Sequence, residues 1–146
     1  MIAVDTNVLL HAHRRDSPWH DAAEEALRSL SGGAWAIPWP CIHEFLAIAT
    51  HPRVFDPPSP LEDAIAAVES WRASRLVLLG ESTEHWAELC SLLRAGKVTG
   101  PAAHDARVAA ICLQHGIVEL WTADRDFTRF PALRTRNPLP ARPTVG

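Results

Sequence analysis

Five acidic residues, Asp5, Glu44, Asp105, Asp124 and Asp126, have the types and placement expected of a metal-binding cluster. Carboxylates that lie close together repel one another and raise each other's pKa unless a cation lies between them. A ligand set made only of oxygen favours hard ions such as Mg²⁺ or Mn²⁺, and Mg²⁺ keeps water while a few carboxylates and a substrate phosphate hold it. One ion, or two ions about 4 Å apart, lowers the pKa of a bound water and offsets charge on a scissile phosphate. The chemistry that these residues predict is metal-assisted hydrolysis of a phosphodiester bond.

Each acid by itself also has a structural explanation. Asp5 or Asp126 would cap the helix or turn that follows it, and Glu44 or Asp105 would pair with an arginine. The five acids taken together favour a metal, because they stand at two strand ends and on two helix faces. We expect the Glu44 helix to be buried on most sides, since nearly every neighbour in CIHEFLAIA is apolar.

Asp105 lies four residues before Ala109 and seven before Cys112, so the three share one inward stripe of a helix. Asp124 and Asp126 lie two residues apart in LWTADRDF, after an apolar run. If the strand continues through them, they and Thr122 point to one side and Arg125 to the other. We expect Asp124 to bind a metal or hold a metal-bound water, and Asp126 either to reach a second metal or to cap the turn FTRF.

Several neutral or basic residues near these acids are candidates for supporting roles. Thr6, Asn7 and Thr122 would orient Asp5 or a metal-bound water, with helix capping as the alternative for Thr6 and Asn7. His104 would either touch substrate or have only a structural place, on the surface or packed in the core. Trp39 or Trp19 would stack an unpaired base if its ring is exposed, although most of the six tryptophans are expected in the core.

Strands that alternate with helices must position these residues. The expected strands are residues 1–5, 34–38, 75–80 and 117–124, with a short edge strand in 132–139. The apolar third strand is expected to be covered on both faces. The expected helices are residues 6–15, 16–33, 40–52, 61–74, 83–96 and 102–116, the second with Ser17 as N-cap and Pro18 at its first position. This alternation predicts an α/β fold, a three-layer sandwich whose mostly parallel central sheet of four to five strands is flanked by helices. Ligands of such sheets bind beyond the carboxyl ends of the strands, where Asp5 and Asp124 fall.

The composition is that of one globular domain, with 47% hydrophobic residues in 146. We expect a single domain over residues 1–138 and a short C-terminal tail at 139–146. The formal net charge of −3 argues against a broad basic patch. If the five acids bind metal, however, the other 12 acidic residues face 14 Lys and Arg, and the remaining surface carries +2.

Two further expectations come from the absence of patterns. Cys41, Cys90 and Cys112 are odd in number and set among apolar neighbours, which predicts buried free thiols. The sequence has neither a basic leader nor a run of about 20 apolar residues, which predicts a cytoplasmic protein with no membrane segment.

Four motifs in this order resemble the PIN domain, specifically the VapC-type toxins of bacterial type II toxin–antitoxin systems. They are DTNVLL, the Glu in IHEFLAIATHPR, HDARVAA and LWTADRDF, and the resemblance runs from Ile2 to about Pro138. It implies an endoribonuclease that depends on Mg²⁺ or Mn²⁺, with metal ligands at Asp5, Glu44, Asp105 and Asp124 and an extra acid at Asp126. It also implies an RNA substrate and a cognate VapB-like antitoxin partner, and we expect a homodimer.

Two alternatives stay open at this point. One is a catalytically weak PIN-fold module that binds RNA or protein, against which the complete set of acids counts. The other is a metal-dependent phosphodiesterase on another substrate, which should show a deeper pocket with several Arg or Lys side chains converging on it. In the nuclease, in-line attack by water would leave a 5′-phosphate and a 3′-hydroxyl.

Overall fold

A five-stranded sheet forms the centre of the computed structural model, which describes residues 1–141. Its strands are β1 (Ile2–Val4), β2 (Trp35–Pro38), β3 (Leu76–Leu79), β4 (Glu119–Trp121) and β5 (Arg134–Arg136). The order across the sheet is β3-β2-β1-β4-β5, and every adjacent pair is parallel. The predicted sheet, including the short edge strand, is confirmed.

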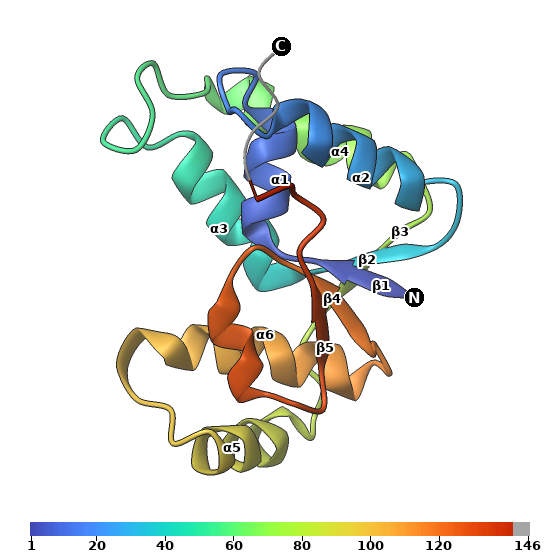
Figure 1. The fold of residues 1–146 in the computed structure, drawn as a ribbon, viewed down its shortest axis with the longest axis vertical. Coiled ribbons are helices and arrows are strands. Elements are labelled where there is room, and N and C mark those ends of the chain that lie inside the picture. Colours follow the sequence, from blue (N-terminus) through green and yellow to red (C-terminus); the bar gives the residue numbers. More distant parts are fainter. Residues whose placement is uncertain (142–146) are drawn as a thin grey trace.

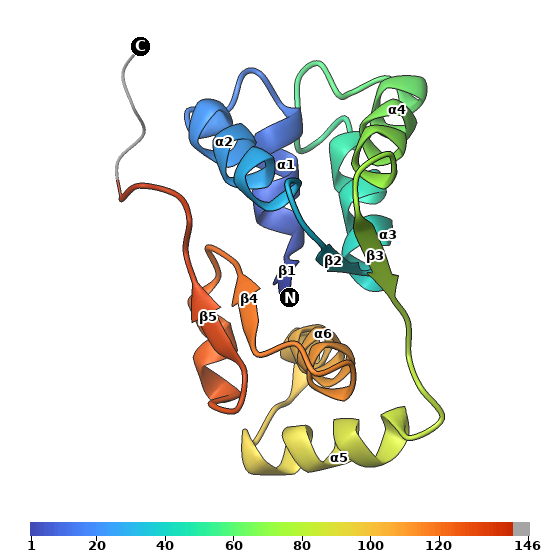
Figure 2. The same ribbon diagram turned by 90° about the vertical axis from the view of Figure 1, so that its right-hand side faces the viewer.

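Helices cover both faces of the sheet. The α-helices are α1 (Thr6–His13), α2 (His20–Leu30), α3 (Trp39–Ala49), α4 (Leu61–Arg72), α5 (His85–Ala95) and α6 (Ala103–Gln114), with short 3-10 helices η1 (Gly100–Ala102) and η2 (Arg125–Arg129). Figure 1 and Figure 2 show α1 to α4 on one side of the sheet and α5 and α6 on the other. This arrangement is the expected three-layer sandwich.

The pairing of the two central strands brings distant parts of the chain together. Val4 of β1 lies opposite Trp121 of β4, and the backbone N–H of Asp5 donates to the carbonyl of Trp121 at 3.0 Å. Thr122 follows directly and donates its N–H to the carbonyl of Arg136 at 2.9 Å. Asp5 and Thr122 therefore leave the carboxyl ends of adjacent strands side by side, although they are 117 residues apart.

Two strands differ from the prediction. β4 ends at Trp121 and not at residue 124, so Asp124 and Asp126 do not share a face through the pleat of a strand. Instead, Asp124 is the N-cap of η2 and its side chain accepts a hydrogen bond from the N–H of Asp126. Of the two alternatives for Asp126, capping this turn is therefore wrong, and contact with a metal stays a prediction. β3 lies at the sheet edge, and Val77 is 40% exposed there, so this apolar strand is not covered on both faces.

The helix starts also shift. α2 begins at His20 and not at Pro18, because the Ser17 hydroxyl accepts the N–H of Trp19 and closes a turn before the helix. α6 ends as predicted near Gly116, whose φ of 71° is in the left-handed region. The backbone N–H of Ile117 then donates to the Cys112 carbonyl at 2.9 Å, which closes the C-terminus of the helix.

The last described residues pack onto the domain. Leu139 is buried in the core, and Nε1 of Trp19 donates to the carbonyl of Pro140 at 3.1 Å. The predicted tail at 139–146 lies partly outside the described residues, since the structure describes the chain only to residue 141, and the proposed domain boundary at 138 stays a prediction. No helix in residues 1–141 has the length and apolar character needed to cross a membrane.

The cysteines and tryptophans follow the prediction in part. Cys41 and Cys112 are buried free thiols, whereas Cys90 is only partly buried. Trp35 is buried in the core, but Trp39 and Trp86 are 42% and 71% exposed. Most tryptophans are in or against the core as expected, since Trp121 is also buried and Trp19 and Trp71 pack against it, and the exposed Trp39 meets the condition set for base stacking.

Candidate active site

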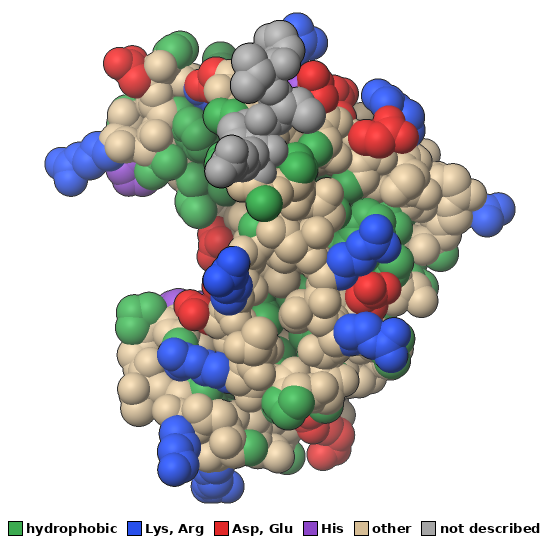
Figure 3. All heavy atoms as spheres, viewed as in Figure 1, with side chains coloured by type: hydrophobic (Ala, Val, Ile, Leu, Met, Phe, Trp, Pro, Cys, Tyr) green, Lys and Arg blue, Asp and Glu red, His purple; other side chains and the backbone are tan. Residues whose placement is uncertain are grey.

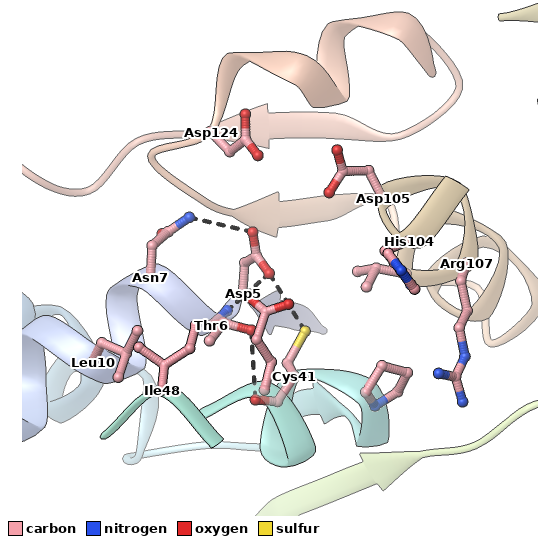
Figure 4. A pocket seen from close by; sticks show the side chains of 13 residues that line it. Asp5, Thr6, Asn7, Leu10, Cys41, Ile48, His104, Asp105, Arg107 and Asp124 are labelled. Atoms are coloured by element: carbon pink, nitrogen blue, oxygen red, sulfur yellow. Dashed lines mark hydrogen bonds between the residues drawn. The ribbon is translucent and has the colours of Figure 1, made fainter. Parts of the chain in front are cut away.

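Asp5 is the centre of a hydrogen-bond network at the carboxyl end of β1. One carboxylate oxygen, Oδ1, accepts the N–H of Thr6 at 2.8 Å and the thiol of Cys41 at 3.4 Å. The other, Oδ2, accepts the Thr122 hydroxyl at 2.8 Å and Nδ2 of Asn7 at 3.3 Å. Figure 4 shows this carboxylate beside Thr6 and Asn7 of α1 and Cys41 of α3. The side chain is only 8% exposed, and these contacts fix its orientation.

The hydroxyl of Thr122 connects Asp5 to Asp124. The hydroxyl donates a hydrogen bond to Asp5, and its oxygen accepts hydrogen bonds from Nδ2 of Asn7 at 3.1 Å and from the N–H of Asp124 at 3.0 Å. A hydroxyl has one donor and two acceptor positions, so all of its hydrogen-bonding capacity is used. The N–H of Ala123 donates in turn to Oδ1 of Asn7 at 3.0 Å. Thr122 and Asn7 therefore contact the Asp5 carboxylate directly, and their role in catalysis stays a prediction. Asp5 is the N-cap of α1 and accepts the backbone N–H of Thr6.

Three of the predicted acids, from α6 and η2, lie close together. Carboxylate oxygens of Asp105, Asp124 and Asp126 lie within 4.8 Å of one another. Asp105 comes from the first turn of α6, and the other two come from the start of η2. Metal–oxygen bonds are about 2.0 to 2.6 Å long, so a single hard cation is able to contact all three acids. The donor set contains only oxygen, which fits Mg²⁺ or Mn²⁺ and does not resemble a zinc site.

Four of the five predicted acids line one cavity of about 250 Å³. Asp5, Glu44, Asp105 and Asp124 line it, and Asp126 stands exposed at the side of Asp105 and Asp124. The space-filling view in Figure 3 shows a hollow at one edge of the molecule with acidic side chains on its walls. The structure thus brings together the predicted acids from four separate segments.

Glu44 is placed differently from the prediction. The helix buries Cys41, Ile42, Phe45 and Ala49, but Glu44 is exposed where α3 borders the cavity. Ile42, Phe45 and Ala49 turn into the core, whereas Cys41 and Ile48 line the cavity together with Glu44. Glu44 is therefore free to turn toward a ligand.

The clustering of carboxylates changes their acidity. Burial, followed by the nearby Asp124 and Asp5 charges, raises the pKa of Asp105 from 3.8 to about 6. Burial also raises the pKa of Asp5, although the hydrogen bond from Thr122 opposes that shift, and burial and the Asp5 charge raise the pKa of Glu44. All three carboxyl groups are thus destabilised in their charged form, which a bound cation would reverse.

Several cavity residues were not singled out from the sequence. Cys41 donates its thiol to Asp5, and burial together with the Asp5 charge raises its pKa well above the usual thiol value, which keeps it protonated. Its position three residues before Glu44, on one side of a helix, was the signal available. Arg107, two residues after Asp105, also lines the cavity from α6 and was not singled out. The exposed His104, which the sequence did name as a candidate substrate contact, lines it one residue before Asp105.

Comparisons with known proteins agree with this geometry. The chain matches the PIN domain family over residues 2–133. It is 34% identical over 138 residues to Ribonuclease VapC48 from Mycobacterium tuberculosis, covering 92% of this chain and 95% of that protein. It is 33% identical over 142 residues to VapC ribonuclease Mb2897 from Mycobacterium bovis, covering 95% and 96%.

Solved structures share the fold at lower identity. The Mycobacterium tuberculosis VapC20, described as a sarcin-ricin loop cleaving toxin, superimposes with a TM-score of 0.67 at 16% identity and covers 88% of this chain and 93% of its own. VapBC2 from Rickettsia felis, bound to a DNA fragment from its promoter, gives 0.66 at 20% identity, with coverage of 94% and 98%. From the match over residues 2–133 and the curated relatives, this chain belongs to the PIN-domain family and, within it, to the VapC group.

Proposed function

We propose that this protein is a divalent-metal-dependent endoribonuclease and the toxin of a toxin–antitoxin pair. The observation that carries the proposal is the oxygen-only cluster in which Asp105, Asp124 and Asp126 lie within 4.8 Å of one another beside Asp5. The curated VapC relatives are named ribonucleases, and they match nearly the whole chain. Among the described residues that line the cavity, Arg107 is the one Arg or Lys, which does not favour a small-substrate phosphodiesterase.

The cofactor we propose is Mg²⁺, with Mn²⁺ as a substitute. Asp105 and Asp124 would hold it, with Asp5 and Glu44 completing the set and Asp126 reaching it from the side. When bound, the ion supplies a water of lowered pKa and neutralises charge on the scissile phosphate. Thr122 and Asn7 keep the Asp5 carboxylate in one orientation, and Cys41 does so from the other oxygen. These contacts form within the protein, so the geometry is set before RNA binds.

Cleavage of a fluorescently labelled single-stranded RNA under single-turnover conditions tests the activity. We expect cleavage with Mg²⁺ or Mn²⁺, none in excess chelator, and none with Asp5→Asn. The matched control is Asp21→Asn, an exposed acid of α2 that does not line the cavity, which should cleave like the wild type. Full cleavage in excess chelator would overturn the metal-dependent mechanism.

The partner we propose is a VapB-like antitoxin. Structural neighbours include VapBC and FitAB complexes bound to DNA, in which a toxin is paired with its partner. An apolar cavity of about 300 Å³, which Leu10, Ile48, Val54 and Phe55 help to line, adjoins the acidic cavity through the shared residues Asn7, Leu10 and Ile48. An antitoxin segment would place apolar side chains in this second cavity and a cationic side chain in the acidic one.

Expression in a bacterial host tests the toxin role. We expect the wild type to arrest growth and Asp5→Asn to be harmless, while the protein encoded by the adjacent small reading frame restores growth. If wild type and Asp5→Asn are equally harmless, the toxin proposal loses its support. A homodimer is the oligomeric state we propose, and light scattering of the purified protein measures it.

A further inference from the structure

A second surface adjoins the acidic cavity and is not used by the proposed chemistry. We call it the Trp39 surface, and it consists of Trp39, His43, Gly80, Glu81 and Arg107. Trp39 begins α3, and the next residue, Pro40, lines the acidic cavity. The indole is 42% exposed and lies over the His43 ring at 6.0 Å between centroids, tilted by 33°. A large aromatic face is thus open to solvent next to the site of cleavage.

The loop after β3 connects Trp39 to the basic side chain of the cavity. A methyl group at Gly80 would lie 3.8 Å from Cδ1 of Trp39, so the loop passes directly by the indole. The carbonyl of Gly80 accepts Nε2 of His115 at 2.8 Å, which anchors the loop to the end of α6. Glu81, the next residue, accepts a hydrogen bond from Nε of Arg107. Arg107 itself lines the acidic cavity, so the Trp39 surface is continuous with it.

The hydrogen bonding of these side chains leaves them open to a ligand. Two of the tryptophans use Nε1 within the protein: Trp35 donates to Ser74 at 2.8 Å and Trp19 to the Pro140 carbonyl, whereas Nε1 of Trp121 is buried without a partner. The hydrogen bonds of residues 1–141 include none from Nε1 of Trp39. In the same described part of the chain, Glu81 is the one acceptor bonded to Arg107, through Nε, so Nη1 and Nη2 remain for a phosphate.

We propose that the Trp39 surface binds one nucleotide of the RNA next to the scissile phosphate, with its base stacked on Trp39 and its phosphate on Arg107. This inference rests on the proposed ribonuclease function. Stacking on an aromatic ring tolerates every base, so the surface sets the path of the strand and contributes little to base identity. Glu81 holds the guanidinium in place and partly neutralises it, and so it limits the strength of the phosphate contact.

An abasic scan tests the stacking contact. Single-turnover cleavage is measured on a series of RNA oligonucleotides, each with one abasic position near the cut, for the wild type, Trp39→Ala and Trp39→Phe. In the wild type, one abasic position should lower kcat/KM by about tenfold. Trp39→Ala should lower kcat/KM on intact RNA by a similar factor. For this variant, kcat/KM should be the same on the RNA with that abasic position as on intact RNA. Trp39→Phe should have most of the wild-type kcat/KM.

Salt dependence tests the phosphate contact. Binding of the same RNA is measured with Ca²⁺ in place of Mg²⁺ at several salt concentrations. Arg107→Gln should weaken binding and reduce the slope of log affinity against log salt by about 0.7. Glu81→Gln keeps a hydrogen-bond acceptor but removes its charge, and it should strengthen binding. A misfolded or merely destabilised variant would not produce these opposite changes.

Controls on α5 match both substitutions. Trp86→Ala removes a tryptophan that is 71% exposed, and Arg94→Gln removes an exposed arginine of the last turn, and neither residue lines the cavity. Both should cleave and bind like the wild type. The proposal is overturned if each abasic position lowers kcat/KM of Trp39→Ala by the same factor as it lowers that of the wild type. It is also overturned if Trp39→Ala changes the oligomeric state in size-exclusion chromatography without changing cleavage, which would make the surface a protein contact. If the wild type cleaves no RNA at all, the proposed function fails instead.

Discussion

The carboxylate of Asp5 accepts four hydrogen bonds, from a backbone amide, a thiol, a hydroxyl and a side-chain amide. These contacts hold the carboxylate in one orientation before a ligand arrives, which lowers the cost of binding in the reactive geometry. The other acids are less constrained. Glu44 and Asp126 are exposed, and Asp124 accepts the N–H of Asp126 at 2.8 Å. Asp5 is therefore the fixed point around which the remaining ligands adjust.

Substitution of the paired acids ranks their roles. Asp124→Asn keeps the cap of η2, because an amide oxygen also accepts the Asp126 N–H, but it removes a charge that lines the cavity. We expect it to lower the single-turnover rate by about 100-fold or more at saturating Mg²⁺, and Asp126→Asn to lower it less. Equal losses would make both acids ligands of the ion, and a larger loss at Asp126 would reverse the ranking.

The hydroxyl of Thr122 has a separable effect. Thr122→Val preserves shape but leaves the Asp5 carboxylate, Nδ2 of Asn7 and the Asp124 N–H each without one partner. We expect a loss of about 1 to 3 kcal/mol in the free energy of unfolding and a 10-fold or larger loss of cleavage rate. Thr122→Ser retains the hydroxyl and should retain both properties, as measured by denaturant unfolding and single-turnover cleavage. Wild-type behaviour of the valine variant would show that Asp5 is positioned without Thr122.

At the scale of elements, the end of α6 fixes how the chain returns to the sheet. Gly116 has a φ of 71°, and the next residue, Ile117, is buried and leads into β4. α6 carries Asp105 at its other end, and β4 leads to Asp124, so the turn between them sets the relative position of two proposed ligands.

The left-handed conformation predicts a cost for any side chain at this turn. Gly116→Ala should destabilise the protein by about 1 kcal/mol, since alanine pays for the left-handed backbone that glycine adopts freely. Gly32→Ala is the matched control, because it has open space around its Cβ position and no positive φ. Urea unfolding of both variants measures the difference, and equal stabilities would remove the argument from conformation.

For the whole molecule, the burial and mutual repulsion of these acids make the stability of the fold depend on pH and on metal binding. The pKa of Asp105 is raised from 3.8 to about 6, so the folded protein keeps a proton that the unfolded chain has released. A raised carboxyl pKa stabilises the fold below about pH 4, and this contribution is lost as the pH rises through 6. The raised pKa values of Asp5 and Glu44 act in the same direction.

Unfolding experiments in chelator at pH 5 and pH 7.5 measure this coupling. Because other acids also titrate, the comparison is with Asp105→Asn, which should lose less stability than the wild type between the two pH values. Mg²⁺ at pH 7.5 should stabilise the wild type clearly and the variant less, and its affinity for the wild type should fall below pH 6. An identical pH dependence for both proteins would show that Asp105 does not carry the coupling.

The sequence by itself determined the alternation of strands and helices and the identity of the acids at the cavity. Apolar runs of short length and helical periodicity are local properties, and a carboxylate directly after an apolar run marks the end of a strand, as at Asp5. The PIN-domain resemblance then followed from four short motifs whose order is preserved. Gly116 was also readable, since a glycine after a helical pattern is the usual stop.

Only the tertiary structure decided how these acids are held. β4 ends at Trp121, and the next residue, Thr122, donates its hydroxyl to Asp5, a residue 117 positions away. No local pattern encodes that contact. Local pattern also suggested a buried environment for Glu44, whereas the packing of α3 leaves it exposed at the cavity. The Trp39 surface likewise depends on the order of β1, β2 and β3, which brings the loop at Gly80 past the indole. Strand order and the contacts between distant segments come from the burial of the whole core, whereas periodicity reports only which face of each element enters it.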